Sequence, residues 1–153
     1  MQPRYLHLPP NDVWRFVQTI SRPQEPKRPL PYTEEHVSYD SHPAGVTLSG
    51  TLTLPTSNGP FPTVILIAGS GPNDRDETVF GHRPFLVLSD YLTRLGIAVL
   101  RFDKRGCGQS TGHYDVATSQ DFADDVLAGM TCVKSRTEVN SNQIGLIGHS
   151  EGG

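Results

Sequence analysis

This sequence lacks several features that would assign a protein to a functional class at once. No stretch approaches the roughly 18 consecutive apolar residues of a membrane-spanning helix, so no membrane span is expected. Lys and Arg never occur more than two in a row and the net charge is -3, which argues against nucleic-acid binding. The N-terminus has no apolar signal-peptide core, so the cytoplasm is the default expectation.

Cysteine is also scarce, and the patterns of metal and phosphate sites are absent. The 2 cysteines, Cys107 and Cys132, form no CxxC motif, so we expect two unpaired thiols. No histidine, cysteine or carboxylate grouping has metal-ligand spacing, and no Gly-Lys-Ser/Thr phosphate loop occurs. We therefore expect neither a metal nor a cofactor.

Proline, by contrast, is abundant at the start of the chain. More than half of the 13 prolines lie within residues 1–34, a density that disfavours helix and favours an extended path. We interpret this segment as an arm or linker, or alternatively as the end of an upstream domain. Within it, residues 11–20 are compatible with a short amphipathic helix. The regular fold is expected to occupy residues 35–153.

Hydrophobic patterning within residues 35–153 predicts an α/β fold. Residues 46–54 alternate apolar and small polar side chains, which is typical of a half-buried antiparallel strand, and a shorter strand is expected at 36–39. Continuous apolar runs predict buried strands at 63–68, 97–102 and 144–147. Because helices are expected between these runs, the sequence predicts βαβ crossovers and a mostly parallel sheet with helices on both faces.

Two amphipathic helices are predicted between the buried strands. Apolar residues at helical spacing define the buried face of each: Leu88, Tyr91, Leu92 and Leu95 in the first, and Phe122, Val126, Met130 and Val133 in the second. The second helix should begin at Thr118, whose spacing to Asp121 fits a capping box. Residues 139–143 are polar and predict a turn before the last strand.

That last strand runs into Gly148-x-Ser150-x-Gly152, the pattern of a nucleophile elbow. A serine hydroxyl is a poor nucleophile unless it is held free of its backbone and close to a base. A sharp turn between strand and helix presents it in this way, provided that the residues two before and two after it are glycines. Ser150 is therefore the candidate nucleophile, and Gly148 and Gly152 are the elbow glycines.

Three motifs together resemble those of the α/β-hydrolase superfamily, and more narrowly its bacterial esterase and acyl-peptidase-like members, often described as serine aminopeptidase-like. They are the elbow and the segments following two buried strands, Gly69-Ser70-Gly71-Pro72-Asn73-Asp74-Arg75-Asp76 and Arg101-Phe102-Asp103-Lys104-Arg105-Gly106-Cys107-Gly108-Gln109-Ser110-Thr111-Gly112. The resemblance implies that Ile144–Ile147 lies beside Thr63–Ala68. It also implies an oxyanion hole made by the backbone N–H groups of Ser70 and Glu151.

Plainer structural interpretations remain open for several of these residues. Gly69-Ser70-Gly71 fits a simple tight turn as well. For Asp74, Arg75 and Asp76 we favour mutual salt bridges that hold the loop, and for Arg105 a loop-anchoring role. Asp124 and Asp125 are expected to be solvated. His149 should point away from the serine hydroxyl, whereas His82 and His113 are weaker candidates for lining a pocket.

The resemblance also implies an acid and a histidine base that follow the serine in chain order, and only three residues follow Ser150. We therefore expect an incomplete and inactive hydrolase domain. In this chain alone, residues 144–147 should form an open, apolar edge strand, which predicts low solubility. The substrate class would be a small-molecule ester or a peptide-like compound. Two alternatives are a non-catalytic α/β binding or scaffold module with a relic elbow, and a fragment that completes its sheet with another chain.

Overall fold

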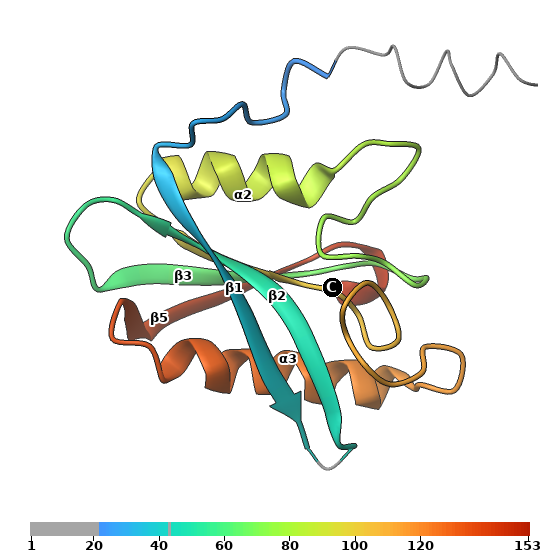
Figure 1. Cartoon of the computed structure of the whole chain (residues 1–153). Coiled ribbons are helices and arrows are strands. Elements are labelled where there is room, and N and C mark those ends of the chain that lie inside the picture. The colour runs from blue at the N-terminus through green and yellow to red at the C-terminus, as the bar shows by residue number, and fades with distance from the viewer. Residues whose placement is uncertain (1–21, 43) are drawn as a thin grey trace, which may run out of the picture.

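The computed structural model describes residues 22–42 and 44–153, so the helix predicted at 11–20 lies outside the described residues. The elements are β1 (Tyr32–Ser41), β2 (Val46–Pro55), β3 (Phe61–Ile67), α2 (Pro84–Arg94), β4 (Ala98–Phe102), α3 (Ser119–Lys134), β5 (Val139–Gly148) and the short 3₁₀ helix η1 (Ser150–Gly152). The five strands form one sheet in the order β1-β2-β4-β3-β5. Helix α2 covers one face of this sheet and α3 the other (Figure 1).

The sheet is mixed, as the hydrophobic patterns predict. β1 pairs antiparallel with β2, and β2 pairs antiparallel with β4. β3 lies parallel to both β4 and β5, and Thr63–Ile67 pairs with Ile144–Gly148, which confirms the expected neighbourhood. Because β3, β4 and β5 are parallel, their carboxyl ends lie along the same edge of the sheet. The segments that follow these three strands meet at this carboxyl-end edge.

Successive side chains along each strand point to opposite faces of the sheet, so the core is divided into two clusters, one on each face. Ile65 and Leu100 point toward α3, where they join Val126 and Val133 in the larger apolar cluster. The next residue of β3, Leu66, faces α2 and packs in the smaller cluster. Strands β3 and β4 are thus buried on both sides, which explains their continuous apolar sequences.

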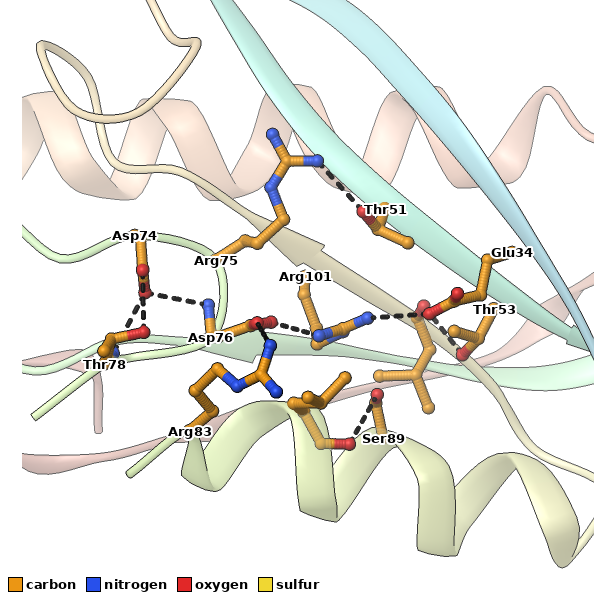
Figure 2. A network of polar contacts seen from close by, with 12 residues as sticks. Glu34, Thr51, Thr53, Asp74, Arg75, Asp76, Thr78, Arg83, Ser89 and Arg101 are labelled. Carbon is orange, nitrogen blue, oxygen red and sulfur yellow. Dashed lines mark hydrogen bonds and ion pairs between the residues drawn. The ribbon is translucent and has the colours of Figure 1, made fainter. Parts of the chain in front are cut away.

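Helix α2 buries a different set of residues from the predicted stripe. Leu88 and Leu92 pack against the core as expected, but Tyr91 and Leu95 are mostly exposed. Phe85, Ser89 and Thr93 complete the buried face of the helix. Ser89 is labelled on α2 in Figure 2. Thr93 forms a hydrogen bond with Thr53 of β2 at 2.6 Å between their Oγ1 atoms. This hydrogen bond lies on the buried side of α2, which therefore includes small polar residues that the apolar pattern did not predict.

Helix α3 begins as its sequence predicts. The Thr118 side chain accepts a hydrogen bond from the Asp121 amide, and the Asp121 carboxylate accepts one from the Thr118 amide, so both halves of the capping box are present. Val126 and Val133 are buried, and Met130 is partly buried against the same cluster. Neither helix in the described part of the chain has the length and hydropathy needed to cross a bilayer.

Asp125 is buried, which contradicts its expected solvation. Its side chain is paired in a bidentate manner with Arg105, at 2.9 Å from Nε and 2.7 Å from Nη2. Arg105 also donates to the carboxylate of Asp121, so it ties the loop after β4 to the start of α3, which confirms its anchoring role. Sequence spacing alone missed Asp125 because its neutralising partner lies 20 residues away.

Asp125→Ala is expected to lower the free energy of unfolding by about 3 kcal/mol, because it removes the buried bidentate partner of the Arg105 guanidinium and leaves only the more exposed Asp121 carboxylate. Urea denaturation of the complete protein measures this loss. The matched control is Asp124→Ala, whose exposed hydrogen bond to Gln120 should contribute no more than about 0.5 kcal/mol. Equal losses in the two variants would contradict the anchoring role of the buried pair.

Strand β5 is longer than predicted and is the outermost strand of this sheet. It begins at Val139, so the polar segment expected as a turn belongs to the strand, although the pairing with β3 shifts between Phe61 and Thr63 to accommodate it. Leu146 and Ile147 are 49% and 37% exposed, as expected for an open, apolar edge strand in this chain. β5 is the outermost strand on its side of this sheet, and among the described strands it pairs only with β3.

Candidate active site

The turn after β5 has the strained geometry of a nucleophile elbow. Ser150 adopts a left-handed backbone conformation with φ of +54°, which is unfavourable for a residue with a side chain. The two neighbouring glycines make this turn possible. A Cβ on Gly148 would lie 1.9 Å from the carbonyl oxygen of Gly152, and a Cβ on Gly152 would lie 2.3 Å from that of Ile67. The pattern Gly-x-Ser-x-Gly is therefore a steric requirement of this fold.

The loop after β3 lies directly against this elbow. A Cβ on Gly69 would lie 3.2 Å from the Cβ of Ser150, and the His149 amide donates to the carbonyl of Ile67 at 3.0 Å. The structure thus brings Ser70, the next residue of the loop, close to Ser150. All predicted site residues consequently lie in two adjacent turns at one edge of the sheet.

Two backbone N–H groups remain free at this edge. The Gly69 amide donates to Glu77 Oε1 and the Gly71 amide to the Tyr114 hydroxyl, each at 2.8 Å. The Ser70 amide between them has no partner within the described residues, and Ser70 is exposed. In the first turn of η1, the Glu151 amide is likewise unpaired among these residues. Free and fixed N–H groups of this kind can stabilise an oxyanion.

Glu77 is a member of the site that the sequence reasoning missed. It is 7% exposed and has a positive φ of 52°. Its Oε1 accepts from the Gly69 amide and lies 2.7 Å from Nδ1 of His149. The His149 ring is therefore held by a carboxylate. Glu77 carries no sequence signal of its own beyond following Asp74-Arg75-Asp76.

Lys104 was also overlooked, because the motif that contains it was interpreted as structural. Its side chain is only 6% exposed. The Nζ atom donates to the Gly69 carbonyl at 2.6 Å and lies 3.1 Å from Glu151 Oε2. It also lies 4.5 Å from the ring centroid of Phe122 and 5.6 Å from that of Tyr114. Lys104 therefore connects the loop after β3 with the elbow.

The charged residues after this loop hold it to the sheet, but not through each other as expected. Arg75 pairs with Asp103 at 2.6 Å, and Asp76 pairs with Arg101 of β4. Asp74 instead accepts hydrogen bonds from Thr78. Figure 2 shows Asp76 between Arg101 and Arg83, with Arg75 directed toward Thr51 of β2. The ion-pair partners of Arg75 and Asp76 lie in or directly after β4, more than 20 residues away, which local sequence cannot reveal.

Asp103 depends on this network for its ionisation. Burial favours its neutral form, but hydrogen bonds from the Arg75 side chain and from the amides of Gln109 and Arg75 hold the pKa of Asp103 below its usual value. By contrast, burial raises the pKa of Asp76, and the attraction of Arg101 only partly opposes this. Asp103 is therefore the group in this network whose lowered pKa links stability to pH.

The ionised Asp103 stabilises the fold above about pH 4, the ordinary pKa of an aspartate, and this stabilisation is lost as the pH falls through the lower pKa of the folded state. Asp103→Asn should therefore lose less unfolding free energy than the wild type between about pH 5 and about pH 2. Chemical denaturation across this range measures the difference. Exposed Asp115→Asn is the control and should keep the wild-type profile. An unchanged profile for Asp103→Asn would contradict the assignment.

Other candidates from the sequence lie elsewhere or have different roles. His82 lines a separate cavity with Tyr91 and Leu88. Cys107 and Cys132 are free, as expected. Among residues 22–42 and 44–153, no three His, Cys, Asp or Glu side chains gather as metal ligands. An apolar cavity of about 350 Å³ opens beside the elbow between α3 and β5, and its lining includes Lys104 and Glu151.

Comparisons with known proteins agree with this geometry. A family model described as "Serine aminopeptidase, S33" matches residues 84–153. The chain is 35% identical to esterase EstD of Thermotoga maritima over 105 residues, which are 69% of this chain and 25% of that protein. It is 36% identical to esterase FrsA of Yersinia enterocolitica over 110 residues, 70% of this chain and again 25% of the relative. The chain thus spans about a quarter of the length of these relatives.

Solved structures show the same fold. The Pyrococcus furiosus esterase Pf2001 has a TM-score of 0.63 and 29% identity, over 79% of this chain and 44% of that one. The esterase Est1E of Butyrivibrio proteoclasticus, solved with ferulic acid bound, has a TM-score of 0.64 and 27% identity, over 76% of this chain and 43% of that one. The α/β hydrolase GrgF from Penicillium has a TM-score of 0.65 and 25% identity, over 78% and 38%.

Proposed function

We propose that the protein cleaves an ester, thioester or amide bond with Ser150 as nucleophile, on the grounds of its α/β-hydrolase fold and its similarity to esterases and serine aminopeptidase-like proteins. A small-molecule carboxylic ester is the foremost candidate substrate, because the relatives named above are esterases. The observation that carries the proposal is the positive φ of Ser150 at the turn beside the Gly69 loop.

In the proposed reaction, the Ser150 Oγ attacks the acyl carbon and the carbonyl oxygen becomes an oxyanion. The N–H groups of Ser70 and Glu151 would donate to that oxyanion, because both are free of other partners in the described chain. Such donors act where negative charge develops, and losing one typically costs about 3–4 kcal/mol of transition-state stabilisation. Collapse of this intermediate breaks the bond to the alcohol, thiol or amine, which departs with the proton taken from Ser150 and leaves the acyl group on Oγ. Water then hydrolyses this acyl ester, which releases the carboxylic acid and restores the Ser150 hydroxyl.

The proton of Ser150 requires a base, which we place on a histidine outside these 153 residues. The superfamily order is serine, then acid, then histidine, and this chain covers 25% of its curated relatives. His149 is not assigned this role. Its Nδ1 lies 2.7 Å from the Glu77 carboxylate, so the ring is already held by a residue of the neighbouring loop.

Covalent labelling tests the proposed nucleophile. A fluorophosphonate should label the complete protein at Ser150, because phosphonylation requires an activated hydroxyl and a site for the phosphoryl oxygen. Peptide mass mapping identifies the labelled residue, and Ser150→Ala should remove the label. If the complete, folded protein stays unlabelled, or carries the label elsewhere, the proposal fails and a non-catalytic α/β module becomes the better description.

A further inference from the structure

The proposed function leaves a buried cation unexplained. Lys104 is one of three buried basic residues in the stretch from Arg101 to Arg105, and each has a carboxylate partner on another element, which for Lys104 is Glu151 of the elbow. Unlike the two arginines, Lys104 also reaches the loop after β3, where its Nζ lies 2.6 Å from the Gly69 carbonyl oxygen. Burying an ammonium group is costly unless each of its donors is used, so this placement calls for a specific explanation.

The carbonyl that Lys104 contacts belongs to the peptide unit of the Ser70 amide. This unit is trans, so its C=O and N–H point in opposite directions. Lys104 holds the oxygen from the buried side, and the Nδ2 of Asn73 donates to the same oxygen at 2.9 Å. The Ser70 N–H is consequently directed away from Lys104, toward the exposed side of the loop.

A charged donor to the Gly69 carbonyl oxygen also makes the Ser70 N–H of the same peptide unit a stronger hydrogen-bond donor. Hydrogen bonds polarise one another through a peptide unit, so a cation on the oxygen makes the nitrogen a better donor. The low exposure of the Lys104 side chain limits screening by water, and the contact is charge-assisted. The Ser70 amide is therefore both oriented and strengthened.

The remaining contacts of Lys104 fix its position. Nζ pairs with Glu151 Oε2 at 3.1 Å, so the same ammonium group holds the residue that offers the second free amide. Its other side faces the stacked rings of Tyr114 and Phe122, and Tyr114 accepts a hydrogen bond from the Gly71 amide. This arrangement couples the geometry of both proposed oxyanion donors to one side chain.

From this geometry we infer that Lys104 is a positioning residue for catalysis, which orients and polarises the Gly69–Ser70 peptide so that the Ser70 N–H stabilises the oxyanion. Lys104 does not touch the reacting atoms. It acts on the transition state through the backbone and leaves substrate binding in the ground state largely unaffected. The inference rests on the proposed function and assigns a role within the same site.

Lys104→Met in the complete protein tests the inference, because methionine fills a similar volume without charge or donor. We expect kcat for a p-nitrophenyl ester to fall about tenfold or more, with KM changed less than about twofold, since the full loss of an oxyanion donor costs about 10²–10³. The inhibition constant of a boronic acid, which mimics the tetrahedral intermediate, should rise by the same factor as kcat falls. Exposed Lys134→Met is the matched control and should keep wild-type kinetics.

Other outcomes separate the inference from its alternatives. An unchanged kcat, or a change confined to KM, would overturn it. If Lys104→Met fails to fold, Asn73→Ala decides the matter, because it removes the neutral donor to the same carbonyl. That variant should show a smaller loss in kcat at constant KM, and wild-type kinetics would refute the inference. Full activity in Ser150→Ala would instead contradict the proposed function itself.

Discussion

Ser150→Ala is expected to reduce the hydrolysis of short-chain p-nitrophenyl esters by the complete protein about 10⁴-fold or more. Serine hydrolases lose on the order of 10⁴- to 10⁶-fold in kcat when the nucleophile is removed, because only binding and oxyanion stabilisation remain. The hydroxyl is small and exposed, so its removal should leave the fold intact. Steady-state kinetics measures the loss, and thermal melting monitors the fold.

A second serine on the same strand provides the control for this experiment. Ser141 lies in the exposed, irregular part of β5, away from the elbow, and Ser141→Ala should retain wild-type turnover. Comparable turnover in Ser150→Ala and the wild type would remove Ser150 from the mechanism. Such a result would leave the fold assignment untouched, because the fold rests on the sheet and its structural relatives.

Gly148→Ala is expected to have the second largest effect, and it acts through the backbone. The added Cβ would lie 1.9 Å from the Gly152 carbonyl oxygen, which is a backbone atom without a rotamer to escape into. The elbow would have to open, which should cost about 3 kcal/mol of stability or more. Because displacements of about 1 Å can cost 10²-fold in rate, turnover should fall by at least that factor.

The same strand supplies a matched control for the glycine variant. A Cβ on Gly145 would meet only the Cγ1 atom of Val64, at 3.4 Å, which is an ordinary contact. Gly145→Ala should therefore preserve both turnover and melting temperature. If Gly148→Ala behaved like Gly145→Ala, the elbow would be far more tolerant than the structure indicates, and the steric explanation of the motif would be wrong.

Much of the fold could be read from local pattern. Continuous apolar runs identified the strands that are buried on both faces, and Thr118 with Asp121 correctly marked the start of α3. The errors occurred where burial depends on a neighbouring element. Tyr91 and Leu95 match a helical stripe but are exposed, because the side of α2 that faces the sheet carries Ser89 and Thr93 instead.

The site shows a similar division. Ser150 and its glycines could be predicted as site candidates because a sharp turn imposes a short and regular spacing on the sequence. Glu77 and Lys104 were not, because their contacts to Gly69 span 8 and 35 residues of the chain. A charged residue in a loop has the same appearance in sequence whether it is solvated or buried against a backbone carbonyl.

The sequence by itself determined the order of strands and helices along the chain and the Gly-x-Ser-x-Gly turn around Ser150. These properties follow from spacing along the chain, because strand period, helix period and tight turns are all local. Only the tertiary structure decided which charges are buried and which backbone groups remain free. Those depend on segments that β3, β4 and β5 bring together at one edge of the sheet. The free N–H of Ser70 and the buried Nζ of Lys104 are the two clearest cases.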